Sequence, residues 1–255
     1  MEIDLSDRGV IVTGASSGIG RGIALQLASS GASVVVADIQ EEPRGTATPT
    51  HEVINERGGE ATFKQVDTSQ ESSVQDLVYE AAMFLDGIDG LVNNAGVHHS
   101  AKLHEESTED WKRLLDINLN GYYYCLKHVL HHFMEENTDG DIVNIGSIAG
   151  LVGFGESPAY CASKGAIVEL TREVALDYGP HGININAVDP GVIKTQMTAP
   201  MLDDETTSSH LTDNTVAPRL GRPSDIANTT AFLLSDKSNF ILGENITVDG
   251  GWTAH

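Results

Sequence analysis

The sequence predicts an α/β fold in one domain, a doubly wound parallel sheet of about seven strands with helices on both faces. Short apolar runs rich in β-branched residues alternate with longer stretches of helical periodicity along the chain. The short runs are apolar throughout, which is typical of strands buried on both faces of a parallel sheet. No proline-rich linker or low-complexity tract divides the 255 residues, so we expect a single domain over residues 1–255.

The expected elements alternate as strand and helix, and such repeats require right-handed crossovers between parallel strands. The apolar, β-branched segments expected to form strands are Val10–Thr13, Ser33–Ala37, Thr62–Val66, Gly90–Val92, Asp141–Ile145, Ile183–Val188 and Asn245–Val248. The segments with helical periodicity are Gly18–Ser29, Thr50–Arg57, Glu71–Leu85, Glu109–Met134, Pro158–Tyr178 and Pro223–Leu234.

Two irregular segments interrupt this alternation. Residues 39–49 form a long loop after the second strand, and residues 196–217 are polar without a strong period. The second segment is the better candidate for a mobile lid over a site at the carboxyl ends of the strands. A disordered surface insertion is the alternative.

The charge balance is strongly acidic, because 37 Asp and Glu oppose 15 Lys and Arg for a formal net charge of −22. Self-repulsion of this size destabilises a compact state in dilute buffer and is weakened by concentrated salt. The composition therefore predicts a protein of a salt-loaded, halophilic cytoplasm, with an ordinary acidic cytosolic protein as the alternative. The sequence has no basic patch of the kind that binds phosphates, so we do not expect nucleic acid as a partner.

The cysteines and the N-terminus bear on the compartment. Cys125 and Cys161 are too few for a disulfide framework, which favours a reducing interior. The N-terminus has no apolar signal core, and no run of about 18 apolar residues follows. We expect a cytoplasmic protein without a membrane partner.

A glycine-rich turn, TGASSGIG at Thr13–Gly20, follows the first strand and opens the first helix. Glycines let backbone amides approach a pyrophosphate, and a helix N-terminus favours anions. About twenty residues on, Asp38 ends the second strand, where a carboxylate accepts hydrogen bonds from a ribose diol and repels a 2′-phosphate. The pattern predicts NAD rather than NADP, with Arg44 as the residue that could soften this preference.

Tyr160 and Lys164 project from one face of an expected helix, because residues four apart are neighbours there. A phenol has a pKa near 10, and lowering it to about 7 needs about 4 kcal/mol of phenolate stabilisation. A nearby ammonium and the positive nicotinamide ring have the right sign for this task. A surface pair of no catalytic role is the alternative.

These motifs together resemble the short-chain dehydrogenase/reductase family, whose domain is a Rossmann fold. The resemblance covers the chain and rests on TGASSGIG, NNAG at Asn93–Gly96, Ser147, YCASK, PGVIKT at Pro190–Thr195 and VDGG at Val248–Gly251. It implies a catalytic set of Asn118, Ser147, Tyr160 and Lys164, in which Asn118 holds a water linked to Lys164. Tyr160 would exchange the hydroxyl proton of an alcohol while hydride passes between its carbon and NAD.

The resemblance also implies the cofactor contacts and the assembly. The cofactor residues would be Gly14, Ser16, Ser17, Gly18, Ile19, Gly20, Asp38, Ile39, Asp67, Thr68, Asn94, Ala95, Gly96, Tyr160, Lys164, Pro190, Gly191, Ile193 and Thr195. Relatives are usually homotetramers, built with the helices that hold Asn118 and Tyr160 and with the region near Val248.

The substrate is expected to lie against Ser147 and Tyr160, and in relatives the regions of His98, His99 and Glu156 line the cleft. These polar groups favour a sugar or polyol, so the leading hypothesis is an NAD-dependent alcohol or sugar dehydrogenase. A reductase of 3-oxoacyl thioesters is a second hypothesis, and a dinucleotide-sensing regulator without turnover is a third.

A helical histidine cluster, His128, His131 and His132 with Glu135, has the spacing of a metal site. Histidines near a helix C-terminus more often complement its dipole, and hydride transfer of this kind needs no metal. We therefore expect none.

Overall fold

The computed structural model describes residues 3–45 and 48–254. Residues 46 and 47 of the loop predicted over 39–49, and residues 1, 2 and 255 of the predicted domain, lie outside the described residues.

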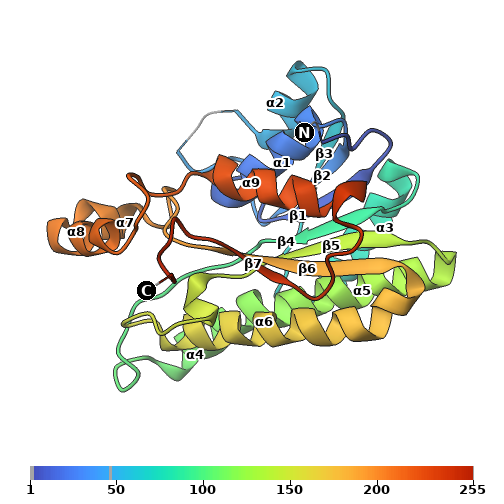
Figure 1. The fold of residues 1–255 in the computed structure, drawn as a ribbon. Helices are drawn as coiled ribbons and strands as arrows, with labels where there is room; N and C mark the ends of the chain where they lie inside the picture. The colour runs from blue at the N-terminus through green and yellow to red at the C-terminus, as the bar shows by residue number, and fades with distance from the viewer. Residues whose placement is uncertain (1–2, 46–47, 255) are drawn as a thin grey trace.

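The strands form one parallel seven-stranded sheet in the order β3-β2-β1-β4-β5-β6-β7, which confirms the predicted fold class (Figure 1). Their bounds are β1 Gly9–Thr13, β2 Ser33–Asp38, β3 Ala61–Gln65, β4 Gly90–Asn93, β5 Gly140–Ile145, β6 Ile183–Pro190 and β7 Asn245–Val248. The order reverses between β1 and β4. In open α/β sheets, ligands bind at the carboxyl ends of the strands beside such a reversal.

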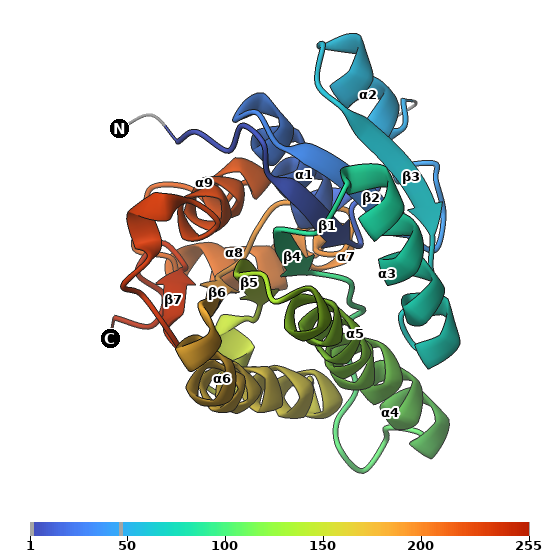
Figure 2. The same cartoon turned by 90° about the vertical axis from the view of Figure 1, so that its right-hand side faces the viewer.

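Helices cover both faces of the sheet (Figure 2). On one face lie α1 (Gly18–Ser29), α2 (Thr50–Glu56) and α9 (Pro223–Leu233). On the other lie α3 (Glu71–Leu85), α5 (Gly121–Glu136) and α6 (Pro158–Tyr178), with α4 (Thr108–Leu115) beside α6. The two layers bury separate apolar clusters, which explains why the strands are apolar on both sides.

The single helix expected over Glu109–Met134 is interrupted in the structure. A π-helical turn, Asp116–Asn120, separates α4 from α5. Such turns insert an extra residue into the helical repeat and are frequent at functional sites. The turn carries the buried Asn118, so the interruption lies where the predicted catalytic set needs a particular side-chain direction.

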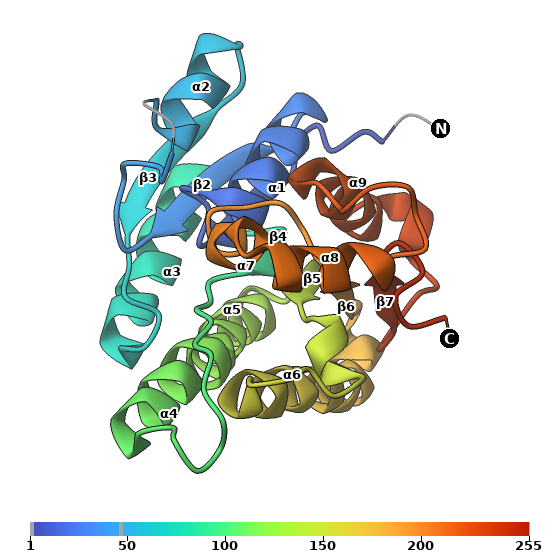
Figure 3. The same ribbon diagram turned by 90° about the vertical axis from the view of Figure 1, so that its left-hand side faces the viewer.

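The segment predicted as a lid, residues 196–217, contains two short helices, α7 (Ala199–Asp203) and α8 (Glu205–Asp213). They lie across the carboxyl ends of the central strands (Figure 3). Asp204 begins α8 because its side chain accepts a hydrogen bond from the Thr207 backbone N–H at 2.8 Å. This cap fixes the start of α8 even though the helical periodicity of the segment is weak. The opening of the segment as a lid remains a prediction.

Candidate active site

A cleft of ≈ 390 Å³ runs along the carboxyl ends of the strands at the reversal point. Its floor is the glycine-rich turn, which is held from the side by Asn94. The Asn94 side-chain amide donates to the carbonyl oxygens of Thr13 at 2.9 Å and Gly14 at 3.1 Å. A Cβ at Gly20 would lie 2.2 Å from the Gly14 carbonyl oxygen, so only glycine permits this close return of the chain. The turn is therefore braced before any ligand binds.

Asp38 stands at the end of β2, on the rim of this cleft. Its Oδ2 accepts a hydrogen bond from the Ser16 backbone N–H at 3.0 Å. The Arg44 backbone N–H donates to the Ser17 hydroxyl at 2.7 Å, which returns the following loop to the glycine-rich turn. Asp38 and Arg44 consequently border the same end of the cleft.

Most residues predicted for the cofactor line this cleft. They are Gly14, Ser17, Gly18, Ile19, Asp38, Ile39, Asp67, Thr68, Asn94, Ala95, Gly96, Tyr160, Lys164, Pro190, Gly191, Ile193 and Thr195. Ser16 and Gly20 are buried behind the cleft instead. Ser16 donates its hydroxyl proton to the Gln40 carbonyl oxygen at 2.7 Å, so its contribution is to hold the loop.

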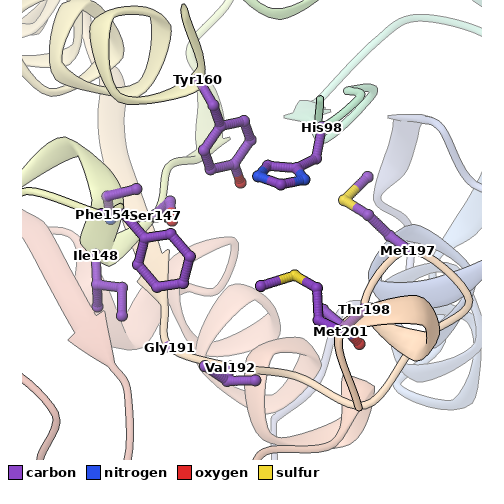
Figure 4. Close-up of a pocket in the computed structure, with 11 residues that line it drawn as sticks. His98, Ser147, Ile148, Phe154, Tyr160, Gly191, Val192, Met197, Thr198 and Met201 are labelled. Carbon is purple, nitrogen blue, oxygen red and sulfur yellow. Dashed lines mark hydrogen bonds between the residues drawn. The ribbon is translucent and has the colours of Figure 1, made fainter. Parts of the chain in front are cut away.

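Tyr160 and Lys164 lie one turn apart at the start of α6. Pro158 occupies the first turn, where its missing N–H costs no helical hydrogen bond. The Tyr160 phenol points into a cavity that also contains His98 and Ser147 (Figure 4). Burial raises the pKa of Tyr160, while hydrogen bonding to Ser147 lowers it. The protein's own groups thus keep the phenol protonated at neutral pH.

The Lys164 ammonium is buried, with 4% of the residue exposed. It donates to the Ile145 carbonyl oxygen at 2.7 Å and to the Tyr122 hydroxyl at 3.2 Å, and it lies 5.9 Å from the Tyr160 ring centroid. Burial lowers the pKa of Lys164 to about 8, and the negative charge of Asp189 raises it. The expected proximity of ammonium and phenol is present, although the ammonium makes its hydrogen bonds elsewhere.

The cavity in front of Tyr160 has a volume of ≈ 80 Å³ and adjoins the larger cleft. Ser147, Tyr160, Gly191, Met197 and Thr198 line both hollows. The remaining wall is largely apolar and includes Ala149. Ile148, Phe154, Val192 and Met201 complete this apolar part of the wall (Figure 4). A small molecule in this cavity would therefore meet Ser147 and Tyr160 on the side that faces the cleft.

His98 is the other polar group of the cavity wall. Its ring stands edge-on to Tyr160, with the ring centroids 5.1 Å apart. Its Nε2 lies 3.0 Å from the Ser157 hydroxyl, which itself donates to the Gly155 carbonyl oxygen at 3.2 Å. With the Ser157 hydroxyl donating to Gly155, the matching His98 tautomer donates from Nε2 and has Nδ1 as an acceptor. Burial lowers the pKa of His98, as does the charge of His99, so the ring is neutral at pH 7.

Asn118 is fully buried and holds the chain that leads to His98. Its Oδ1 accepts from the Val97 backbone N–H and its Nδ2 donates to the Val97 carbonyl oxygen, both at 2.8 Å. Both ends of the side-chain amide are used in this way. The side chain thus fixes the segment after NNAG, and the water expected at Asn118 remains a prediction.

The structure does not bring His99 and Glu156 into the cavity wall, since both residues are exposed and neither lines the cavity. Glu156 has a left-handed backbone (φ 54°), and its carbonyl oxygen accepts from the Ala101 N–H at 2.9 Å. The turn therefore uses the main chain of Glu156 and directs its carboxylate outward.

The histidine cluster of α5 makes carboxylate contacts. His128 Nε2 lies 3.3 Å from Glu71, and His131 Nε2 lies 3.2 Å from Glu135. Within residues 3–45 and 48–254, no group of three or more His, Cys, Asp or Glu side chains could hold a metal ion.

Two buried residues beside Lys164 were missed from the sequence, Tyr122 and Asp189. Nothing in the sequence distinguishes Tyr122 from the other tyrosines of the run GYYY, so its place beside Lys164 could not be predicted. Asp189 does carry one, since it is the one acid in the strand sequence ININAVDP. The cavity residues Phe154, Val192 and Met201 were not predicted, because single apolar side chains outside the strongly periodic elements look alike in sequence.

A cleft at the sheet reversal that shares a serine and a tyrosine with a small cavity defines a dinucleotide-dependent oxidoreductase. Comparison with known proteins agrees. A family model described as enoyl-(acyl carrier protein) reductase matches residues 14–253. The chain belongs to the short-chain dehydrogenase/reductase family, as its motifs predict.

Relatives of known activity are similar over nearly the whole chain. A 2,5-dichloro-2,5-cyclohexadiene-1,4-diol dehydrogenase of Sphingobium indicum is 39% identical over 254 residues, covering 98% of this chain and 99% of the relative. A meso-2,3-butanediol dehydrogenase of Serratia marcescens is 37% identical, covering 96% of this chain and 94% of the relative.

A solved structure from Agrobacterium tumefaciens with bound NADP has a TM-score of 0.92 and 32% identity, with 100% of this chain and 99% of that chain covered. The shared fold positions a dinucleotide cleft in both proteins.

Proposed function

We propose that this oxidoreductase transfers hydride between NAD and the CH–OH carbon of a compact diol, giving the hydroxyketone, or the reverse. The observation that carries the proposal is the junction of cleft and cavity at Ser147 and Tyr160. A carbon held there lies between the dinucleotide and the phenol.

Each side chain has a distinct task in this proposal. The Ser147 hydroxyl binds the substrate oxygen, and Tyr160 exchanges the proton with it. Lys164 supplies a positive charge behind the phenol. An oxidised dinucleotide held in the cleft lined by Asp38 and Asn94 would supply the hydride acceptor and a positive charge, which would offset the burial that raises the pKa of Tyr160.

The cavity wall supports a substrate with a short hydrocarbon body and a second hydroxyl. Phe154, Met197 and Met201 present apolar surface, and the neutral His98 offers an acceptor at Nδ1. A diol satisfies both features, because its second hydroxyl donates to His98 while its carbon frame contacts the apolar wall. The curated relatives include enzymes named for cyclic and short-chain diols.

Replacing His98 tests this assignment. We expect His98→Leu to raise KM about tenfold for compact diols such as 2,3-butanediol, since a buried hydroxyl loses its acceptor. The matched monoalcohol 2-butanol should show the same KM with both proteins, because its reacting hydroxyl contacts Ser147 and Tyr160. NADH absorbance measures both rates. Equal losses for diol and monoalcohol would contradict a contact between His98 and the second hydroxyl.

The second candidate is a reductase of 3-oxoacyl thioesters. The description of the matching family model names an acyl-carrier-protein substrate, although the reaction it names reduces an enoyl double bond. The small cavity and the net charge of −22 oppose an anionic acyl carrier or coenzyme A. Including a 3-oxoacyl thioester in the same absorbance assay separates the two candidates. A sensor without turnover would be silent with every substrate.

For the cofactor we propose NAD, because the Asp38 carboxylate borders the cleft where a 2′-phosphate would lie. We expect Asp38→Asn to lower the NAD/NADP ratio of kcat/KM about tenfold by removing like-charge repulsion. Arg44→Gln is the opposite test and should reduce only the residual use of NADP. A wild-type enzyme that turns over faster with NADP would overturn the assignment.

We further propose a homotetramer in a salt-rich cytoplasm. Exposed apolar side chains on the helices and near the last strand support this proposal: Tyr123 and Met134 on α5, Leu176 on α6, and Phe240 and Leu242 before β7. None of the described helices is long and apolar enough to cross a membrane. Light scattering in KCl measures the mass of the assembly, and a monomer would contradict the proposal.

A further inference from the structure

Asp189 is a fully buried carboxylate at the carboxyl end of β6, directly before the Pro190 that borders the cleft. Burying a carboxylate is costly unless it is hydrogen-bonded or paired with a cation. The catalytic set predicted from the sequence gives Asp189 no task, so its presence calls for a physical reason.

The first contact of Asp189 is with the main chain of the predicted catalytic serine. Its Oδ1 accepts a hydrogen bond from the Ser147 backbone N–H at 3.2 Å. The neighbouring Gly146 donates its N–H to the Val188 carbonyl oxygen at 2.8 Å, which continues the pairing of β5 with β6. A carboxylate on β6 is thus hydrogen-bonded to Ser147, the second residue after β5.

Gly146 allows this approach. A Cβ at Gly146 would lie 1.8 Å from Oδ1 of Asp189, a distance that no side chain could tolerate. Oδ2 is buried and has no hydrogen-bond partner among the described residues. One oxygen therefore binds Ser147, and the charge of the group must be balanced by something other than a second hydrogen bond.

Lys164 is a buried cation in the same region, because its ammonium donates to the Ile145 carbonyl oxygen, two residues before the Ser147 that Asp189 binds. Its ammonium is buried and its hydrogen bonds go to neutral oxygens, on Ile145 and Tyr122. Asp189 is the negative group that acts on Lys164, and Lys164 and Arg172, both on α6, are the cations that act on Asp189. Arg172 is exposed and pairs with Glu169. Asp249, beyond β7, is hydrogen-bonded to Gly251 and Thr253 instead.

We propose that Asp189 is a positioning residue of the active site, which holds the backbone of Ser147 and is the buried counter-charge of Lys164. The inference rests on the proposed roles of Ser147 and Lys164. It explains why one acid interrupts an apolar strand, why glycine precedes Ser147, and how a buried ammonium with neutral hydrogen-bond partners keeps its proton.

The surroundings of Asp189 and Lys164 set the pH range over which both groups are charged. Burial raises the pKa of Asp189 to about 6, while the Ser147 hydrogen bond and the charges of Lys164 and Arg172 lower it. Burial lowers the pKa of Lys164 to about 8. Both groups are therefore charged between about pH 6 and pH 8. Without the anion, the ammonium would lose its proton at lower pH.

Direct titration of Lys164 tests the counter-charge. The chain has seven lysines, so ¹³C labelling of the lysine Cε gives a simple NMR spectrum, and Lys164→Met assigns the Lys164 signal. We expect Asp189→Asn, which keeps an acceptor for Ser147 but removes the charge, to lower the Lys164 midpoint by about one pH unit. Asp141→Asn is the control, since Asp141 is another buried acid, at the opposite end of the sheet. It should leave the midpoint unchanged.

The rate profile tests the positioning role. In Asp189→Asn the alkaline limb of kcat/KM should move to lower pH with the Lys164 midpoint. Asp189→Ala, which also removes the acceptor for Ser147, should lower kcat about tenfold more, because misplacing a catalytic group weakens transition-state contacts. Equal kcat values for the Asn and Ala variants would refute the attachment to Ser147.

An unchanged Lys164 midpoint in Asp189→Asn overturns the counter-charge at any level of activity. The NMR titration needs no turnover. A shifted midpoint in an enzyme that is inactive on every alcohol would refute the proposed function and leave the pair intact. If Asp189→Asn does not fold, Lys164→Met provides the reciprocal test. Its Asp189 midpoint, read from ¹³Cγ-aspartate, should rise, and an unchanged value would refute the pairing.

Discussion

Tyr160→Phe is expected to reduce kcat for alcohol oxidation by at least about 10³-fold while leaving NAD affinity within a few-fold of the wild type. The substitution removes one oxygen, the atom at the junction of the two hollows. A loss of 10³ corresponds to about 4 kcal/mol of transition-state stabilisation. Steady-state kinetics and fluorescence titration with NADH measure the two quantities.

Tyr178→Phe is the matched control, because Tyr178 ends the same helix, α6, far from the cavity. It should retain wild-type turnover. Tyr160→Phe with more than about a tenth of the wild-type kcat would show that another group exchanges the proton.

The pKa of Tyr160 gives this prediction a mechanistic extension. Burial raises the pKa of the phenol in the protein, and its hydrogen bonding to Ser147 lowers it only in part. The ammonium of Lys164 is hydrogen-bonded to Ile145 and Tyr122, away from the phenol oxygen. We therefore expect that an oxidised dinucleotide, when bound, would add the positive charge that lets Tyr160 act as a base. This arrangement would keep the base inactive until the hydride acceptor is in place.

Much of the fold was predictable because buried parallel strands leave a strong pattern. The expected strand over Ser33–Ala37 differs from β2 by one residue, and the expected helix over Pro158–Tyr178 coincides with α6. The π-helical turn at Asp116–Asn120 was not predictable, because its residues continue the helical period. Its geometry comes from packing around Asn118, which hydrogen-bonds to a segment twenty-one residues earlier.

The candidate site shows the same division. The site residues that were predicted lie at strand ends or helix starts, and the alternation of strands and helices brings such positions to one edge of the sheet. They are the glycines of the first turn, Asp38, Ser147, Tyr160 and Lys164. Asn118 turns out to use its side chain on Val97, which no local pattern could indicate. The exposed Glu156 was expected in the cavity because sequence distance from Tyr160 cannot reveal a left-handed backbone. Long-range pairings such as Asp189 with Ser147 depend on strand order and become visible only in the assembled sheet.

The melting temperature is expected to rise by about 10 °C or more between 0.1 and 2 M KCl. The Debye length falls from about 10 Å to below about 3 Å over this range, so repulsion between unpaired surface acids is largely removed. The chain has 37 acids for 15 Lys and Arg, which leaves 22 acids without a cation even if every Lys and Arg were paired. For a chain of this size, each 1 kcal/mol corresponds to about 2–4 °C, so a gain of about 3–5 kcal/mol is needed.

A charge-neutralising variant separates screening from general salt effects. Glu56 on α2 and Asp76 on α3 are exposed, and we expect Glu56→Gln combined with Asp76→Asn to raise the melting temperature at 0.1 M KCl. At 2 M KCl the variant and the wild type should melt at nearly the same temperature, because the repulsion is already screened. A gain that is equal at both concentrations would point to helix propensity instead. A wild-type melting temperature that does not change with KCl would show that repulsion between the surface acids does not limit stability. The proposed adaptation to a salt-rich cytoplasm would then be wrong.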